Sequence, residues 1–210
     1  MIKNILKTLP ILALIALLPC TGNAAKVKGH DWRDPVVQIK GAIDFVSELS
    51  FALEVSNIII EKQLTDDEDK DIKVVINSPG GYVYHGYNII GMMRRAQYLG
   101  YSFTCVVENH AASMAAIIFA HCDSRYMIAG SKLLHHRPYI PEPHWSNMSY
   151  EEQANFEREV IVMLYVIADV IGMNPEKYID LCDEDRFMSA REAKRRGFTQ
   201  KITRSFHYLN

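Results

Sequence analysis

The chain has 210 residues, of which 49% are hydrophobic and 23% are charged, and its formal net charge at pH 7 is −2. This balance is that of an ordinary globular protein, so it excludes intrinsic disorder, collagen-like repeats and a small disulfide-dense scaffold. A net charge so close to zero also argues against a surface that binds nucleic acid or an anionic membrane.

The first 24 residues have the pattern of a secretory signal peptide. Lys3 and Lys7 give a basic beginning, and residues 9–18 form an apolar stretch that only a proline interrupts. Small residues at Gly22 and Ala24 then fit the positions that a signal peptidase reads. We therefore expect cleavage after Ala24 and export, to the periplasm.

An uncleaved membrane anchor is the less favoured alternative, because the apolar stretch is too short to span a bilayer comfortably. A lipoprotein attached at Cys20 is disfavoured as well, since Pro19 stands where a lipobox has Gly, Ala or Ser. No repeat or low-complexity linker follows, so residues 25–210 are expected to form a single domain.

Three short apolar runs predict buried parallel strands at residues 36–39, 72–76 and 103–107. These runs are rich in Val and Ile and alternate little, as in strands that are covered on both faces. Helical periodicity predicts two helices between them, over residues 43–64 and 82–97.

Capping residues predict three helices in the C-terminal half: one opened by Ser149 and Glu152 and ended by Gly172, one started by Asn174 and Pro175, and one from Ser189 to Gly197. Strands that alternate with helices favour right-handed βαβ units. The predicted fold class is therefore α/β.

Three cysteines lie beyond the signal peptide, at Cys105, Cys122 and Cys182. In an oxidising compartment this odd number permits at most one internal disulfide, and the sequence does not choose the pair. We expect Cys105 to be a small buried hydrophobe in its strand. No CxxC motif or His-rich cluster indicates a metal, and we expect no cofactor.

The segment 104–120, TCVVENHAASMAAIIFA, is the most informative in the chain. Its strand is expected to end at Val107, and a short polar turn should lead to a small-residue helix that begins near Ser113. A serine at a helix N-terminus lies where free N–H groups and the helix dipole favour developing negative charge. By itself such a serine is most often a helix cap, and the GxSxG pattern of other hydrolases is absent.

Two further segments supply groups that suit a reactive serine. Paired glycines in the turn 78–81, SPGG, allow backbone N–H groups to approach a ligand and stabilise an oxyanion. Residues 133–138, LLHHRP, put His135 and His136 at the end of an apolar strand. Side chains alternate along a strand, so only one of the two histidines can face the site.

The segments INSPGG, HAASMAA, HxP and EDRFMSAREAKRRG follow one another in the order of the motifs of the Clp protease proteolytic subunit (ClpP) family. The chain resembles this family from about residue 36 to residue 202. The resemblance implies the ClpP/crotonase fold, a spiral of ββα units with a protruding handle helix, here expected at residues 150–171. It also implies hydrolysis of peptide bonds in short or unfolded polypeptides through an acyl-enzyme.

By this resemblance Ser113 is the nucleophile, His136 the general base and Asp185 the carboxylate that orients the imidazole. The backbone N–H groups of Gly81 and Met114 are implied to form the oxyanion hole. Such a set is chemically consistent, because serine needs a neutral imidazole to take its proton and a carboxylate to fix the tautomer of that imidazole.

Other residues near these motifs open alternatives. His135 is the alternative base, and His110 is expected to be structural or to line the rim of the site. Lys132 would serve a Ser–Lys dyad like that of signal peptide peptidase A. A non-catalytic assembly or binding protein on the same fold is a third hypothesis. A crotonase-type acyl-CoA enzyme is disfavoured, because it would not need the serine, histidine and aspartate together.

The chain departs from the family pattern in features that concern its partners. Few residues precede the first strand, so the segment that the family uses to gate and to dock an unfoldase is missing or reduced, and an exported protein lacks a comparable ATP supply. We therefore expect no ATP-driven unfoldase. Residues 138–143, PYIPEP, replace a Gly-rich stretch, and Glu184 stands where many members have an Arg implicated in ring pairing. We expect a homo-oligomeric ring, hexameric or heptameric, rather than a stacked double ring.

Overall fold

The computed structural model describes residues 36–65 and 68–204, all of which belong to the compact unit Asp34–Asn210. The predicted signal peptide and its cleavage position lie outside the described residues. Within the two described ranges, no helix combines the length and the hydropathy that crossing a membrane requires.

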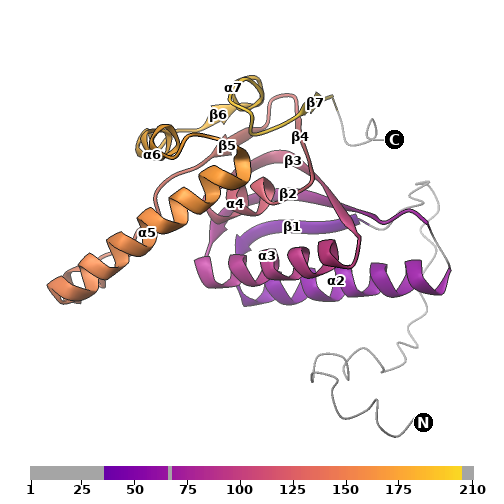
Figure 1. The fold of residues 1–210 in the computed structure, drawn as a ribbon, viewed down its shortest axis with the longest axis horizontal. Helices are drawn as coiled ribbons and strands as arrows, with labels where there is room; N and C mark the ends of the chain where they lie inside the picture. The colour runs from indigo at the N-terminus through magenta and orange to yellow at the C-terminus, as the bar shows by residue number, and fades with distance from the viewer. Residues whose placement is uncertain (1–35, 66–67, 205–210) are drawn as a thin grey trace, which may run out of the picture. The chain divides into compact units, whose positions relative to one another are not determined.

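The described elements are strands and helices that alternate along most of the chain (Figure 1). The strands are β1 (Val36–Ile43), β2 (Asp71–Gly81), β3 (Ser102–Ala112), β4 (Ser124–Ile128), β5 (Lys132–Leu134), β6 (Met188–Ser189) and β7 (Lys201–Thr203). The helices are α2 (Phe45–Leu64), α3 (Val83–Tyr98), α4 (Met114–Ala120), α5 (Tyr150–Ile171), α6 (Pro175–Asp183) and α7 (Ala190–Arg195), with a short 3-10 helix at Trp145–Asn147.

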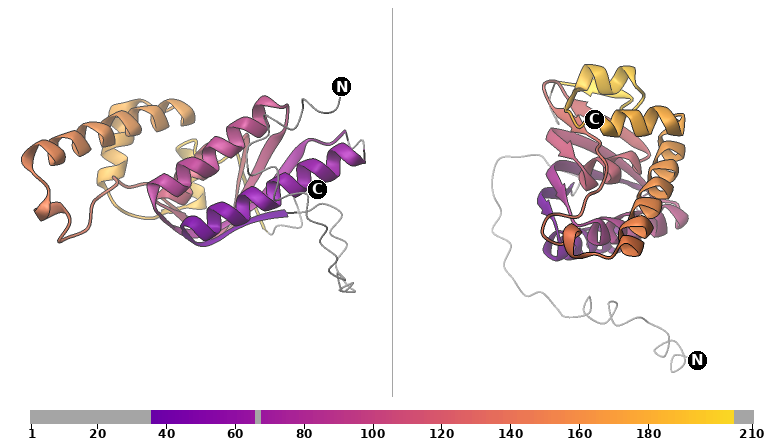
Figure 2. Two further views of the ribbon diagram at one scale, coloured as in Figure 1. Left: turned by 90° about the horizontal axis from the view of Figure 1, so that it is seen from below. Right: turned by 90° about the vertical axis from the view of Figure 1, so that its left-hand side faces the viewer.

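The sheet is mainly parallel and follows the order β1-β2-β3-β4-β7. Strand β5 pairs with the end of β3 in parallel and with β6 in antiparallel orientation. Helices α2 and α3 run side by side against the β1 side of the sheet, and the N-terminal half of α5 extends beyond it (Figures 1 and 2). The predicted α/β class is confirmed, and α5 spans the residues expected for a protruding helix.

The three predicted strands are present, and each of them is longer than its apolar run. Gly80 and Gly81, expected in a turn, continue β2 because they remain paired with Ala42 and Ile43 of β1. Strand β3 was expected to end at Val107, yet it continues to Ala112 because β5 offers its last residues a second partner. The prediction of a polar turn between Val107 and the next helix is therefore wrong.

The helix ends follow the capping residues closely. Ser149 and Glu152 form both halves of a capping box at the start of α5, and Gly172 ends that helix with a φ of 70°. Asn174 caps α6 and Ser189 caps α7, each through a side chain that accepts from a backbone N–H three residues on. These boundaries depend on local hydrogen bonds, which is why the sequence predicts them well.

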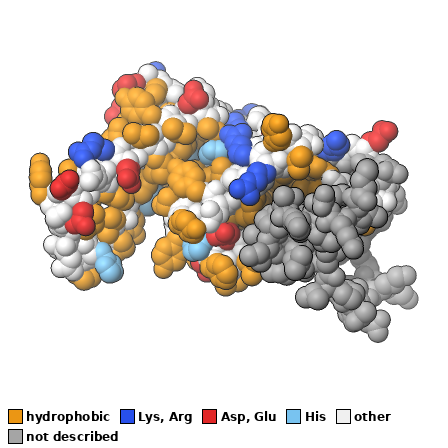
Figure 3. Space-filling model, turned by 60° about the horizontal axis from the view of Figure 1, so that its bottom comes forward, with side chains coloured by type: hydrophobic (Ala, Val, Ile, Leu, Met, Phe, Trp, Pro, Cys, Tyr) orange, Lys and Arg blue, Asp and Glu red, His pale blue; other side chains and the backbone are white. Residues whose placement is uncertain are grey.

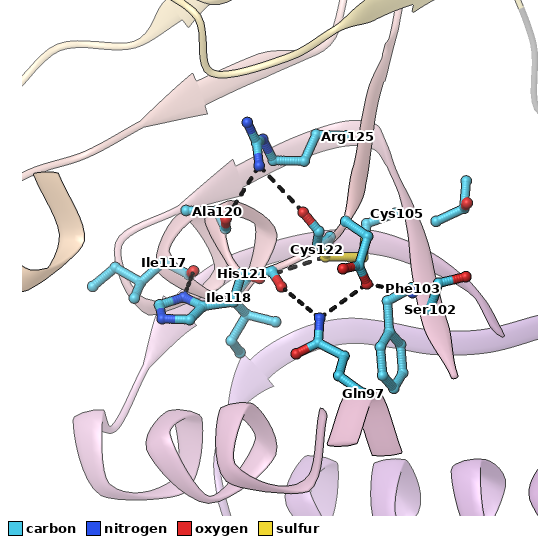
Figure 4. The surroundings of a disulfide bond; sticks show 12 residues. Gln97, Ser102, Phe103, Cys105, Ile117, Ile118, Ala120, His121, Cys122 and Arg125 are labelled. Carbon is cyan, nitrogen blue, oxygen red and sulfur yellow. Dashed lines mark hydrogen bonds between the residues drawn. A yellow bond between two sulfur atoms is a disulfide. The ribbon is translucent and has the colours of Figure 1, made fainter. Parts of the chain in front are cut away.

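A disulfide joins Cys105 in β3 to Cys122 just after α4, with a Cα–Cα distance of 6.0 Å (Figure 4). Cys105 is buried as predicted, but the expectation that it is only a small hydrophobe is wrong, because its sulfur is bonded. The two cysteines are 17 residues apart, and the loop that they close contains Ser113. Cys182 is buried and free.

Polar side chains hold the chain at the end of α4, beside the disulfide (Figure 4). The Arg125 guanidinium donates to the carbonyl groups of Ala120 and Cys122, at 3.4 and 3.2 Å. The Gln97 amide donates to the carbonyl of His121 at 3.3 Å. Carbonyl groups that the last turn of a helix leaves without partners are satisfied in this way.

Candidate active site

Ser113 lies between the last residue of β3 and the first residue of α4 and is partly accessible. Its backbone has a φ of 55° and a ψ of −127°, a conformation that residues other than glycine adopt rarely and that is concentrated at functional sites. The Ser113 side chain makes no capping hydrogen bond to α4. The Ser113 hydroxyl is therefore not a helix cap, although capping is the most common role of a serine at the start of a helix.

The first glycine of the pair that ends β2 packs directly against this serine. A Cβ atom on Gly80 would lie 2.6 Å from the Ser113 Cβ and 3.0 Å from the backbone nitrogen of Met114. Gly80 also has a φ of 93°, so only glycine fits at this position. The end of β2 is thereby brought beside the first N–H of α4, which has no acceptor within its own helix.

The two residues predicted to supply the oxyanion hole lie next to Ser113 or to the glycine that contacts it. Met114 contributes the first N–H of α4, and Gly81 follows the glycine that touches Ser113. Gly81 has a φ of 155°, and a Cβ there would collide with the backbone of Ile43. The arrangement can therefore present N–H groups to a developing oxyanion.

His136 is brought toward Ser113 by strand β5. The Ser113 N–H donates to the carbonyl of Leu134 at 2.9 Å, and His136 follows Leu134 by two residues. The imidazole is mostly buried, with 17% of the side chain exposed, and it packs edge-on against Tyr139.

Asp185 lies next to His136, just after the end of α6. Its Oδ1 atom is 3.8 Å from the Nδ1 atom of His136, within ion-pair range but longer than a direct hydrogen bond. The carboxylate is 71% exposed, and the Asp185 backbone has a φ of 42°. Catalytic hydrogen bonds are often long in the absence of substrate and shorten in the complex.

His135 points away from the site. Its ring is buried, stacks on Phe198 at 4.7 Å and hydrogen-bonds through Nδ1 to the Tyr178 hydroxyl at 2.8 Å. Burial, with a smaller effect of the neighbouring His136, lowers the pKa of His135 to about 3. A histidine enclosed in this way cannot exchange a proton with a serine at the surface, which argues against the alternative base.

The other two candidates, His110 and Lys132, lie on the paired strands β3 and β5. His110 is half-buried near the end of β3 and is the register partner of Lys132. Lys132 is exposed and lines a surface pocket of about 560 Å³ together with Phe187 and Arg191. These surroundings give Lys132 no feature of a buried, desolvated lysine of the kind that acts as a base.

Charged side chains on α7 and around Glu184 form a connected set. Glu184 pairs with Arg186 at 2.8 Å and with Arg196 at 3.6 Å, and Arg186 also bonds to Glu192. The acidic residue at position 184, which departs from the family pattern, is therefore neutralised by arginines of the same chain.

The site contains no arrangement suited to a metal: among the described residues, no group of three or more His, Cys, Asp or Glu side chains is placed to hold an ion. Sequence reasoning missed Tyr178 and Asp183, which bond to the residues on either side of His136. No motif marks these two residues, because their partners lie more than 40 positions away.

A comparison with protein-family models matches residues 39–206 to the family described as Clp protease. The matched region begins in β1 and runs past β7, so it includes every residue of the site described above.

Proposed function

Because the chain belongs to the Clp protease family, we propose that it is an exported, ClpP-like serine peptidase. Ser113 is its proposed nucleophile, and its proposed substrates are short or unfolded polypeptides. The observation that carries the proposal is the junction of β2, β3 and β5. There Ser113 has a positive φ, Gly80 approaches its Cβ atom, and its backbone N–H is bonded to Leu134, so that the position of the serine is fixed from three sides.

In the proposed mechanism His136 takes the proton of the Ser113 hydroxyl as the oxygen attacks the carbonyl carbon of the scissile bond. The backbone N–H groups of Gly81 and Met114 stabilise the resulting oxyanion. The imidazolium then gives its proton to the departing amine, which leaves an ester on Ser113. Water, activated by the same imidazole, hydrolyses this ester and frees the serine.

Asp185 is assigned the role of holding the His136 imidazole in the tautomer that accepts the serine proton. The separation of 3.8 Å requires the carboxylate to move closer when the site becomes active. The exposure of the Asp185 side chain is compatible with such a movement.

Export is supported by the disulfide between Cys105 and Cys122, since disulfides persist in oxidising compartments and are rare in the cytosol. A compartment without ATP leaves no role for an ATP-driven unfoldase, so we propose that the peptidase acts alone on substrates that are already short or unfolded.

A homo-oligomeric ring is proposed for the assembled protein. Large apolar side chains are exposed along α2, including Phe45, Val46 and Leu64, and along the start of α3, including Tyr84. Figure 3 shows hydrophobic side chains on the face that carries these helices. Exposed apolar surface on this scale is typical of a face that contacts another protein subunit.

The alternative is a non-catalytic binding protein on the same fold, and the long separation of His136 and Asp185 is the observation that favours it. Incubation of the purified mature protein with a library of fluorogenic peptides distinguishes the two functions. If the protein is a peptidase, it releases the fluorophore, and this release is lost in Ser113→Ala. A binding protein retains the peptide without releasing the fluorophore.

A further inference from the structure

The candidate base His136 and its two neighbours in the sequence each contact α6 or Asp185, which lies two residues after the end of α6. His135 bonds to Tyr178, and Arg137 makes two parallel hydrogen bonds to Asp183, one of them from Nη2 to Oδ2 at 2.9 Å. Between these two contacts, His136 faces Asp185.

We propose that the pairs His135–Tyr178 and Arg137–Asp183 are positioning pairs, which hold the segment 135–137 against α6 and so set the geometry of His136 and Asp185. This proposal rests on the proposed function, because it assigns a role to residues that act through the candidate base. The four residues are called the clamp below.

The inner half of the clamp is buried and hydrogen-bonded. Tyr178 and His135 are both buried, and the Tyr178 hydroxyl is the partner of the His135 Nδ1 atom. Phe198 packs against the same imidazole ring, which fixes its orientation. Because His135 stays neutral well below neutral pH, this hydrogen bond persists under all conditions in which His136 could act as a base.

The outer half of the clamp fixes direction. A guanidinium and a carboxylate joined by two parallel hydrogen bonds allow little rotation about either group. The Asp183 hydrogen bond raises the pKa of Arg137, as expected for such a pair. Both side chains are partly exposed, so the pair adds little to global stability and its main effect is orientation.

The surrounding chain shows why anchors on both sides of His136 are needed. Strand β5 is three residues long and ends at Leu134, before the histidines. Beyond Arg137 the chain contains Pro138, Pro141 and Pro143, which have no N–H to donate. The backbone around His136 therefore lacks a regular hydrogen-bond ladder, and the side-chain contacts to α6 take its place.

The test is the rate of Ser113 labelling by a fluorophosphonate, compared between clamp variants and matched controls. Tyr178→Phe removes one hydroxyl and Asp183→Asn removes one charge, and we expect each to slow labelling about tenfold or more, as misplacement of a catalytic group does. Tyr150→Phe and Asp180→Asn make the same changes at exposed positions on α5 and α6 and should keep the wild-type rate.

The His136→Ala background separates positioning from general loosening of the fold. If the clamp acts through His136, the clamp variants cause no further loss once His136 is absent. An equal loss in the His136→Ala background, or unchanged rates in the His136 protein, overturns the proposal. The exchanged pair Arg137→Asp with Asp183→Arg should recover most of the rate that either single change loses.

Failure of the proposed function is distinguishable from failure of the clamp. If the wild-type protein is not labelled at Ser113, NMR tests the clamp instead. The ring resonances of His136 are observed in protein with isotope-labelled histidine and are assigned by comparison with His136→Ala. We expect Tyr178→Phe and Asp183→Asn to shift these resonances in the same direction as Asp185→Asn. Resonances that remain at their wild-type positions contradict the clamp, whatever the protein's activity.

Discussion

The backbone N–H of Ser113 donates to the carbonyl of Leu134 at 2.9 Å, which ties the residue before α4 to the end of β5. Ser113 is thereby joined to the strand that His136 follows, although the two residues are 23 positions apart in the sequence. The hydrogen bond also gives the strained backbone of Ser113 a fixed partner, so that the strain persists in the folded state.

The contact between Gly80 and Ser113 predicts a severe effect of a single methyl group. Gly80→Ala places a Cβ against the Ala112 carbonyl and the Ser113 Cβ at a φ that disfavours alanine, so we expect a loss of about 1–3 kcal/mol of stability and slower labelling of Ser113. Chemical denaturation and labelling kinetics measure the two effects.

Gly91→Ala is the matched control, because Gly91 lies within α3 and a Cβ there meets no atom within 4 Å. Alanine is the better helix former, so this change should raise stability by about 0.5–1 kcal/mol. Equal effects of the two substitutions would show that Gly80 is not packed against the serine.

The disulfide is expected to stabilise the segment that carries Ser113. Replacing both Cys105 and Cys122 by alanine opens a loop of 17 residues, which should lower the free energy of unfolding by about 3 kcal/mol. Reducing agent should shift the denaturation midpoint of the wild-type protein and leave that of the double variant unchanged. A wild-type midpoint that does not respond to reduction contradicts the pairing.

The remaining cysteine is predicted to be inert in the folded protein. Burial raises the pKa of the Cys182 thiol to about 12, so almost none of it is present as thiolate at pH 8. Iodoacetamide should leave Cys182 unmodified in the native state and modify it in denaturant. Alkylation of the native protein at a rate typical of an exposed thiol would contradict its burial.

The buried His135 predicts loss of stability on acidification. Its pKa is about 3 in the folded state and about 6.5 in an unfolded chain, so below pH 6.5 the unfolded state binds a proton that the folded state does not. Stability should therefore fall by up to about 1.4 kcal/mol for each pH unit between about 6.5 and 3 from this residue.

Comparison of variants isolates the contribution of His135 to the pH dependence. His135→Leu removes the group that titrates and should flatten the dependence of unfolding free energy on pH, even if the stability at neutral pH also changes. His144→Leu, at an exposed histidine, should leave the slope as it is. Burial lowers the pKa of His121 as well, but that residue contributes equally to all three proteins. Parallel curves for wild type and His135→Leu contradict the prediction.

The boundaries of helices and strands that the sequence predicts best are those that depend on local interactions. The ends of α5 follow from Ser149, Glu152 and Gly172, each of which acts on its own helix turn. The end of β3 does not, because Glu108 to Ala112 stay extended only through pairing with β2 and β5. Short strands such as β6 and β7 likewise owe their conformation to partners that are distant in sequence.

In the candidate site as well, local sequence patterns predict some features, and others depend on contacts between residues that are distant in the sequence. Motifs predict Ser113, His136 and Asp185 as site residues, and the structure places His136 Nδ1 and Asp185 Oδ1 3.8 Å apart. The disulfide partner of Cys105 could not be chosen, because three cysteines leave three possible pairs until the fold brings two of them together. The clamp residues Tyr178 and Asp183 lie on α6, and nothing in the sequence links that helix to the segment after β5.

The proposed function requires that His136 activates Ser113 as a nucleophile. Fluorophosphonate labelling of the assembled mature protein, with mass-spectrometric mapping of the adduct, tests it most directly when wild type is compared with Ser113→Ala and His136→Ala. We expect one adduct, on Ser113, that disappears in Ser113→Ala and forms at least about a hundredfold more slowly in His136→Ala. An adduct on another residue, or a folded and assembled wild-type protein that stays unlabelled, would contradict the account.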